Sequence, residues 1–192
     1  LDTGAGGWEL ASGEVCLGAE ALCENEVQEF FDGDGVTVAV GEGVVAITAD
    51  AAGSGEISAA GIVTGARSGL LHTRDGFSFR HGRLEAHLSA PTVEGVVSTV
   101  SLLPLGSSSA NLGQVEVVAV SNGVVSGGLW HSEGNHSCST SGYDFEGSAF
   151  HTFAVEWTED RLRWYAGGRQ YCEVTSSEID EAGEGGSWPF GT

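Results

Sequence analysis

The side chains best suited to chemistry in this sequence are four cysteines, Cys16, Cys23, Cys138 and Cys172. An even number of cysteines is typical of disulfides formed in an oxidising compartment, and their spacing matches no compact zinc motif. Of the three possible pairings, we favour Cys16–Cys23, which would close a short loop, and Cys138–Cys172, which would tie a loop to a strand. The alternative is four reduced cysteines buried in a cytosolic protein.

Other residues with ligating or acceptor chemistry gather near Cys138. Asn135-His136-Ser137 is an N-glycosylation sequon in a Gly- and Ser-rich segment that is predicted to be a loop, and it suits the same oxidising compartment. His131, His136 and Cys138 are close enough in sequence for a metal site, but no further ligand is evident. Asp32-Gly33-Asp34-Gly35 resembles the start of a calcium loop without its later ligands, so it is predicted to be a solvated turn. We therefore expect no metal and no cofactor, with a structural calcium as the alternative.

The overall composition limits the possible partners. A chain of 192 residues is long enough for one domain, and no linker or repeat divides it, so we expect a single domain over residues 1–192. Its 27 acidic and 7 basic residues, the latter all Arg, give a formal net charge of −20. Such a charge repels nucleic acid and anionic membranes, so neither is an expected partner. No stretch reaches the ~18 apolar residues of a membrane span, and 41% hydrophobic residues exclude a disordered polyanion.

Alternation of apolar and polar residues predicts short strands, and 31 glycines against three prolines favour tight turns between them. Hairpins are expected at Gly41-Glu42-Gly43 and at Gly167-Gly168. Thr175 and Glu178 have the spacing of a capping box at the start of one short helix, Thr175 to Ala182. Further strands are predicted at residues 83–88, 96–103, 114–119, 153–157, 162–166 and 169–174. These elements predict an all-β, antiparallel two-sheet sandwich.

Four segments share their pattern and their order with one known family. They are Asn25 to Phe31, Phe77 to Ala86, Phe150 to Tyr165, and Trp188-Pro189-Phe190. Together they resemble glycoside hydrolase family 16, which contains laminarinases, lichenases, agarases and carrageenases. The resemblance implies a concanavalin A-like jelly roll whose concave sheet forms a polysaccharide-binding cleft. That fold has strands before the position of Leu1 and after that of Phe190, so we expect another protein chain or a neighbouring copy to complete the sandwich edges.

The stretch that matches the catalytic strand of this family is altered. The family motif, glutamate-x-aspartate-x-(x)-glutamate, supplies a carboxylate nucleophile and a separate acid/base carboxyl. Here the nucleophile position carries Gln114, and the helper aspartate is replaced by Glu116. The acid/base position falls on Val118 in a regular strand, or on Ala119 behind a bulge. An amide cannot form a stable glycosyl ester, and neither Val nor Ala can donate a proton.

The expected sugar platform is altered as well. Val97 and Ser101 stand where the preceding strand of this family often carries tryptophans, and Leu70 stands where an arginine is expected. Trp130 could be a replacement platform. The alternative is an ordinary core tryptophan.

From these changes we predict that the chain is not an enzyme but a catalytically silent structural or interaction module of an extracellular or cell-surface assembly. One alternative is a β-glucan recognition module with Asn25, Glu116 and Trp130 as candidate sugar contacts. The other is an active β-glycan hydrolase or transglycosylase that uses a different set of residues. Turnover of a β-glucan would separate the active enzyme from the other two interpretations, and glycan binding would separate recognition from a structural role.

Overall fold

The computed structural model describes residues 7–11, 29–30, 38–57, 63–74, 76–105, 113–131, 134–140, 142–181 and 188–190. It divides into two compact units, residues 1–78 and residues 79–192. In the described part, regular structure is β-strand except for helix α2 (Ser176–Glu181). No helix of the described residues is long and apolar enough to cross a bilayer.

The first unit contains short strand pairs. β1 (Glu9–Leu10) pairs with β7 (Leu71–His72), and β6 (Val63–Ser68) lies between β2 (Glu29–Phe30) and β5 (Asp50–Ile57). β3 (Val38–Gly41) and β4 (Val44–Ile47) form the predicted hairpin. Its two turn residues, Glu42 and Gly43, have φ values of 52° and 78°, as a two-residue turn with the twist of the flanking strands requires.

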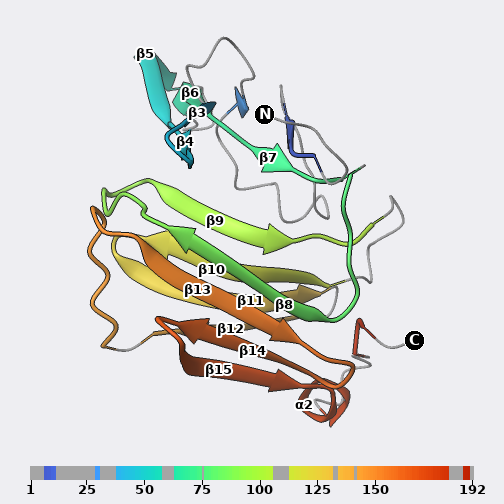
Figure 1. Cartoon of the computed structure of the whole chain (residues 1–192). Helices are drawn as coiled ribbons and strands as arrows, with labels where there is room; N and C mark the ends of the chain where they lie inside the picture. The colour runs from blue at the N-terminus through green and yellow to red at the C-terminus, as the bar shows by residue number, and fades with distance from the viewer. Residues whose placement is uncertain are drawn as a thin grey trace. The chain divides into compact units, whose positions relative to one another are not determined.

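The second unit contains two four-stranded antiparallel sheets (Figure 1). The "β10 sheet" has the order β12-β11-β10-β9, and the "β13 sheet" has the order β15-β14-β13-β8. Their strands are β8 (Gly82–Leu88), β9 (Val97–Leu102), β10 (Gln114–Ser121), β11 (Val124–His131), β12 (Gly134–Ser139), β13 (His151–Trp157), β14 (Arg161–Ala166) and β15 (Arg169–Thr175). The predicted all-β two-sheet sandwich is confirmed.

The core lies between these two sheets because each contributes alternate apolar residues to it. One cluster joins Val115, Val117 and Leu129 of the β10 sheet to Val155, Leu162 and Trp164 of the β13 sheet. A second cluster includes Val118, Val120, Val125, Phe153 and Ala166. Trp164 is fully buried, and its indole N–H donates to the Glu116 carbonyl oxygen at 2.8 Å, so its polar atom is satisfied.

A bulge in β10 shifts which residues face the core. Glu116 pairs with Gly128 and Ala119 pairs with Ser126, so β10 carries one more residue than β11 between these pairs. Val117 and Val118 consequently both contribute to the core. Plain alternation predicts Val118 on the face of Gln114 and Glu116; this is wrong, and the bulge places Ala119 there instead.

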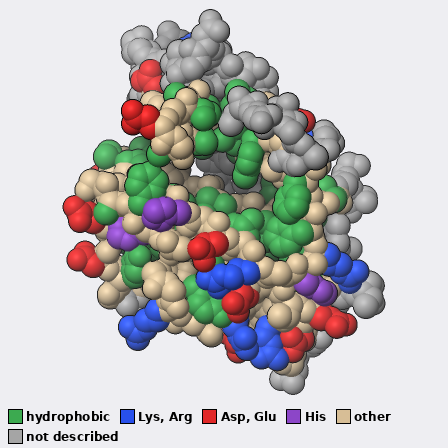
Figure 2. All heavy atoms as spheres, viewed as in Figure 1, with side chains coloured by type: hydrophobic (Ala, Val, Ile, Leu, Met, Phe, Trp, Pro, Cys, Tyr) green, Lys and Arg blue, Asp and Glu red, His purple; other side chains and the backbone are tan. Residues whose placement is uncertain are grey.

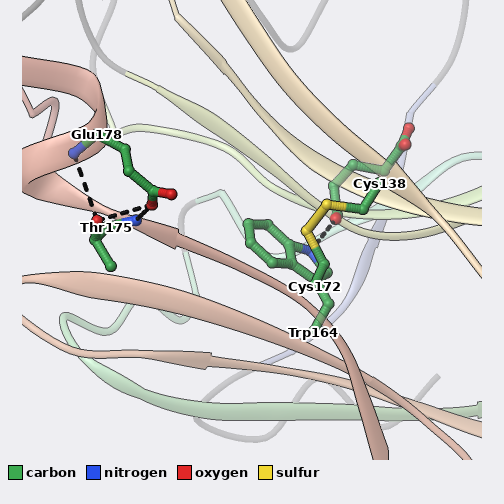
Figure 3. Close-up of a disulfide and its surroundings, with 6 residues drawn as sticks. Cys138, Trp164, Cys172, Thr175 and Glu178 are labelled. Carbon is green, nitrogen blue, oxygen red and sulfur yellow. Dashed lines mark hydrogen bonds between the residues drawn. A yellow bond between two sulfur atoms is a disulfide. The ribbon is translucent and has the colours of Figure 1, made fainter. Parts of the chain in front are cut away.

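A disulfide joins the two sheets at one edge (Figure 3). Cys138 of β12 is bonded to Cys172 of β15, with Trp164 beside them. The predicted Cys138–Cys172 pairing is therefore confirmed, although Cys138 lies in a strand rather than in a loop. Cys16 and Cys23 lie outside the described residues.

The predicted capping box is present at the start of α2 (Figure 3). The Glu178 carboxylate accepts from the Thr175 backbone N–H at 2.8 Å, and the Glu178 N–H donates to the Thr175 hydroxyl at 3.4 Å. This reciprocal pair of bonds fixes where the chain leaves β15 and begins the helix.

The outer face of the β13 sheet carries paired charges. A row of alternating sign crosses its four strands: Arg83, Glu156, Arg163 and Glu173. Arg83 contacts Glu156 at 3.1 Å and Glu85 at 3.0 Å. Figure 2 shows basic and acidic side chains side by side over this sheet. Exposed pairs of this kind contribute ~0–1 kcal/mol each, so this face is explained by solvation and cross-strand pairing.

Candidate functional site

The outer face of the β10 sheet has a different composition. It carries hydroxyl and amide side chains with one carboxyl and one indole: Thr99, Ser101, Gln114, Glu116, Ser126, Trp130, Asn135, Ser137 and Ser139. These residues share a face because alternate strand positions project to the same side, and the bulge keeps β10 in phase with its neighbours. A row across the sheet passes through Ser101, Glu116, Gly128 and Ser137. Glu116 lies at its centre.

The Trp130 ring lies over Gly128, the residue next to Glu116 in the sheet. A Cβ atom added to Gly128 would lie 2.9 Å from both Cη2 and Cζ3 of the Trp130 ring, so the indole occupies the space that a side chain at Gly128 would fill. Gly128 is the cross-strand partner of Glu116. Directly opposed residues in a sheet are ~4.5–5.5 Å apart. The six-membered ring of Trp130 therefore covers the residue directly opposite Glu116.

Burial raises the pKa of Glu116 from 4.5 to about 7. No ion pair to a described residue opposes this effect. The indole beside it and the row of uncharged side chains around it supply the poorly solvated surroundings that disfavour the ionised carboxyl. A carboxyl with this pKa holds a proton in a substantial fraction of molecules at neutral pH, which is the property needed by a general acid.

The neighbours of Glu116 on the same strand supply no second carboxyl. Gln114 is two residues away on the same face and pairs with Trp130. Ala119, 8% exposed, pairs with Ser126 and Thr99. Val118 is fully buried in the core. The structure thus places Gln114, Glu116 and Ala119 together on the outer face and Val118 on the opposite one.

The position of Trp130 favours the interpretation as a platform. It is partly exposed, belongs to neither core cluster, and lies on the face that carries Glu116. Val97, 59% exposed, and Ser101 lie on β9 of the same sheet, so no aromatic side chain occupies those two positions. β9 is at the edge of its sheet in the described part of the chain.

The remaining candidates fall at the rim or outside the described chain. Asn135 is exposed on edge strand β12, opposite Trp130, and not in a loop as predicted. The His131 and His136 rings stack with centroids 5.8 Å apart, while the sulfur of Cys138 is committed to its disulfide. Asn25 lies outside the described residues.

The hydroxyl-bearing side chains of this face were not singled out from the sequence. Ser126, Ser137 and Ser139 are brought together by the pairing of β11 with β12. The signal for two of them was present, because Ser137 and Ser139 alternate with Cys138 in a segment that looked like a loop. Such a face can donate hydrogen bonds to, and accept them from, a neutral ligand rich in hydroxyl groups.

Comparisons with known proteins agree with this architecture. A family model described as "Glycosyl hydrolases family 16" matches residues 25–190. "Glucan endo-1,3-beta-glucosidase A1" of Niallia circulans is 29% identical over 125 residues, a match that covers 58% of this chain and 18% of that protein. The laminarinase catalytic domain from Thermotoga maritima MSB8 has a TM-score of 0.77 at 19% identity, with 96% of this chain and 76% of that chain covered. The laminarinase from Rhodothermus marinus has a TM-score of 0.74 at 20% identity, covering 95% and 74%.

These findings contradict the prediction that the chain is not an enzyme. The matched family is one of glycosyl hydrolases, and the similar proteins are named as glucanases. The changes at positions 114, 118 and 119 do not by themselves show a loss of activity, since Glu116 retains a carboxyl whose pKa is about 7.

Proposed function

Because the chain belongs to glycosyl hydrolases family 16, we propose that it hydrolyses a β-1,3-glucan, with Glu116 as its acid/base group. The observation that carries this proposal is the pairing of Glu116, whose pKa is about 7, with the indole of Trp130 on a face of uncharged polar side chains. The glucanase names of the similar proteins support the choice of substrate.

Substrate binding uses the outer face of the β10 sheet. A sugar ring stacks on the exposed side of Trp130, and the hydroxyls of Ser101, Ser126 and Ser137 bond to its hydroxyl groups. Asn25, within the matched region, is a further proposed contact. An uncharged substrate suits a chain of net charge −20, which would repel a polyanionic glycan.

In the proposed reaction, protonated Glu116 donates its proton to the glycosidic oxygen as the carbon–oxygen bond breaks. Gln114 cannot form a covalent glycosyl ester, so a water molecule attacks the resulting oxocarbenium-like centre directly. The Glu116 carboxylate then accepts a proton from that water, which restores the enzyme. One carboxyl thus serves both proton transfers, and Gln114 is placed to accept a hydrogen bond from the water.

Recognition of β-glucan is a second candidate function. It is favoured by the number of hydroxyl and amide groups on the outer face, which exceeds what proton transfer alone requires.

The Cys138–Cys172 disulfide further supports an extracellular location. Finding the native chain only inside reducing cell fractions would contradict that location.

The hydrolysis proposal is tested with laminarin, a soluble β-1,3-glucan, by measuring the release of reducing ends between pH 4 and 9. Glu116→Gln should lower kcat at least ~10²-fold, the usual contribution of a general acid/base, with little change in laminarin binding. The matched control is Glu94→Gln, which removes an exposed carboxyl from a turn.

Equal activity of Glu116→Gln and Glu94→Gln would contradict the role of Glu116. Binding of laminarin without turnover by the unmodified chain would favour recognition alone. Neither binding nor turnover would contradict both candidate functions.

A further inference from the structure

A pocket of about 290 Å³ lies between the end of β12 and the start of β15, apart from the Glu116 row. We propose that this pocket binds one neutral sugar unit of the β-glucan chain whose neighbouring units lie on the outer face of the β10 sheet. The inference rests on the proposed function for its ligand, and it adds a second point of attachment. Its volume is close to the lower end of small-molecule pockets, ~300 Å³, which suits a single ring.

One aromatic side chain in the lining of this pocket is held in place by its contacts. Tyr143 lines it, and the Tyr143 hydroxyl lies 3.0 Å from Nδ1 of His151. Its ring packs edge-on against Phe153, with centroids 5.9 Å apart. On another side, a Cβ atom at Gly167 would lie 3.4 Å from the Tyr143 ring, and Gly167 has a φ of 56°. The ring therefore cannot turn away freely, and a ligand would meet a preorganised surface.

One lining residue is small and apolar. Ala166, 3% exposed, contributes a short side chain to the lining. Tyr171 completes the aromatic lining from β15. Most of the remaining lining residues are polar, which suits a ligand rich in hydroxyl groups better than an apolar one.

The polar groups at the mouth match hydroxyls. Arg169 and Gln170 are exposed and line one side, while Ser139 lines the other. Arg83, Arg161 and Arg163 each contact a carboxylate, whereas Arg169 forms no ion pair with a described residue. Its guanidinium offers five N–H donors, and the amide of Gln170 both donates and accepts.

The charge of the chain favours a neutral ligand over an anionic one. A single Arg would attract a carboxylate or sulfate group locally, but the net charge of −20 repels an anionic polymer as a whole. A neutral sugar uses the same donors without that repulsion.

The pocket is within reach of the proposed active site. Ser139 pairs with Ser126 and lies on the outer face of β12, so it belongs both to that face and to the pocket lining. β10 and β12 are separated by two strand spacings, ~10 Å. A glucan held beside Glu116 can therefore cross β12 and place a following unit in the pocket at the sheet edge.

The test is calorimetric titration with laminaribiose and laminarihexaose of the whole chain carrying Glu116→Gln, which prevents turnover, with and without the double change Arg169→Ala/Gln170→Ala. The matched control is Arg80→Ala, which removes the same charge from an exposed position outside the pocket. The double variant should bind laminarihexaose about tenfold more weakly, the effect of losing about one charge-assisted hydrogen bond. Laminaribiose is too short to span both positions, so its affinity for the double variant should be the same as without the double change. Both changed residues are exposed, so folding should be unaffected.

Trp130→Ala separates this inference from the proposed function. Weaker laminarihexaose binding by both Trp130→Ala and the double variant supports the pocket and the proposed function. Loss in the double variant alone supports the pocket and contradicts the outer face as the main site. Loss in Trp130→Ala alone, with the double variant equal to Arg80→Ala, overturns the pocket and leaves the proposed function standing. No binding by the chain that carries Glu116→Gln alone overturns both the pocket and the proposed function.

Discussion

At the scale of single residues, the environment of Glu116 decides its chemistry. Its pKa is raised because its surroundings solvate the ionised carboxyl poorly, and the indole of Trp130 is part of those surroundings. The absence of a side chain at Gly128 is what allows the indole to lie there. The raised pKa of Glu116 therefore depends on Gly128 and Trp130 of the paired strand as well as on Glu116 itself.

The raised pKa predicts how stability depends on pH. In the folded chain Glu116 binds its proton more tightly than in the unfolded chain, where its pKa is close to 4.5. Between about pH 4.5 and 7 the folded state therefore carries more protons, so this residue makes the free energy of unfolding fall as the pH rises. The pKa difference sets an upper limit of ~3 kcal/mol, which solvent screening reduces.

Urea unfolding at pH 4.5 and pH 7.5 measures this effect. Glu116→Gln should lose less stability over this interval than the unmodified chain, because an amide does not titrate. Glu94→Gln should keep the pH dependence of the unmodified chain. An identical pH dependence for all three proteins would show that Glu116 titrates normally.

At the scale of elements, the bulge in β10 sets which side chains reach the site. It adds one residue between the Glu116 and Ala119 pairs, so Val118 turns into the core and Ala119 moves to the outer face. Without it, every residue of β10 after Val117 would face the opposite way. The geometry of the site therefore depends on one backbone irregularity as much as on its side chains.

The disulfide between β12 and β15 predicts a large effect on stability. It closes a separation of 34 residues and ties the site-bearing β10 sheet to the β13 sheet. Cys138→Ala/Cys172→Ala should lower the free energy of unfolding by about 3–4 kcal/mol, because the unfolded chain regains the freedom that the bond removes. Urea unfolding without reductant measures this loss. A loss below about 1 kcal/mol would mean that the bond adds little to the sheet contacts.

Elements with strong local signals were predictable from the sequence. The Glu42-Gly43 and Gly167-Gly168 turns and the Thr175–Glu178 capping box follow from residues whose backbone preferences or hydrogen bonds act locally. The sequence did not decide whether β10 contains a bulge, because the adjacent Val117 and Val118 are both apolar and either register buries apolar residues. Strand β12 was missed, because its Gly and Ser residues are typical of loops and only pairing with β11 makes them a strand.

In the site, too, single residues were predictable from the sequence, whereas contacts that depend on strand pairing were not. Glu116 and Trp130 could be nominated from the sequence, since a carboxyl and an indole are conspicuous in it. Their contact through Gly128 could not, because it depends on the register between β10 and β11. The edge pocket could not be predicted either, because it combines residues that are about 30 positions apart and lie on different sheets.

At the scale of the whole molecule, charge is the dominant feature. The formal net charge is −20, and only seven arginines oppose 27 acidic residues. Two of those arginines, Arg83 and Arg163, are used in the ion-pair row of the β13 sheet. The ion pairs stabilise the folded chain and the general repulsion destabilises it, and salt screens both. Added salt therefore lowers stability through the ion pairs and raises it through the repulsion.

We expect the general repulsion to outweigh the local pairs. The ion pairs are exposed and contribute ~0–1 kcal/mol each, whereas repulsion among many uncompensated carboxylates acts over the whole surface and destabilises the compact state. Raising NaCl from 0.01 M to 1 M shortens the screening length from ~30 Å to ~3 Å. At pH 7.5 this change should therefore raise the melting temperature, measured by circular dichroism. At pH 4, where many carboxylates are protonated and the net charge is smaller, the same addition should raise it less. A melting temperature that falls with salt at pH 7.5 would mean that the Arg83–Glu156 and Arg163–Glu173 pairs stabilise the chain more than its net charge destabilises it.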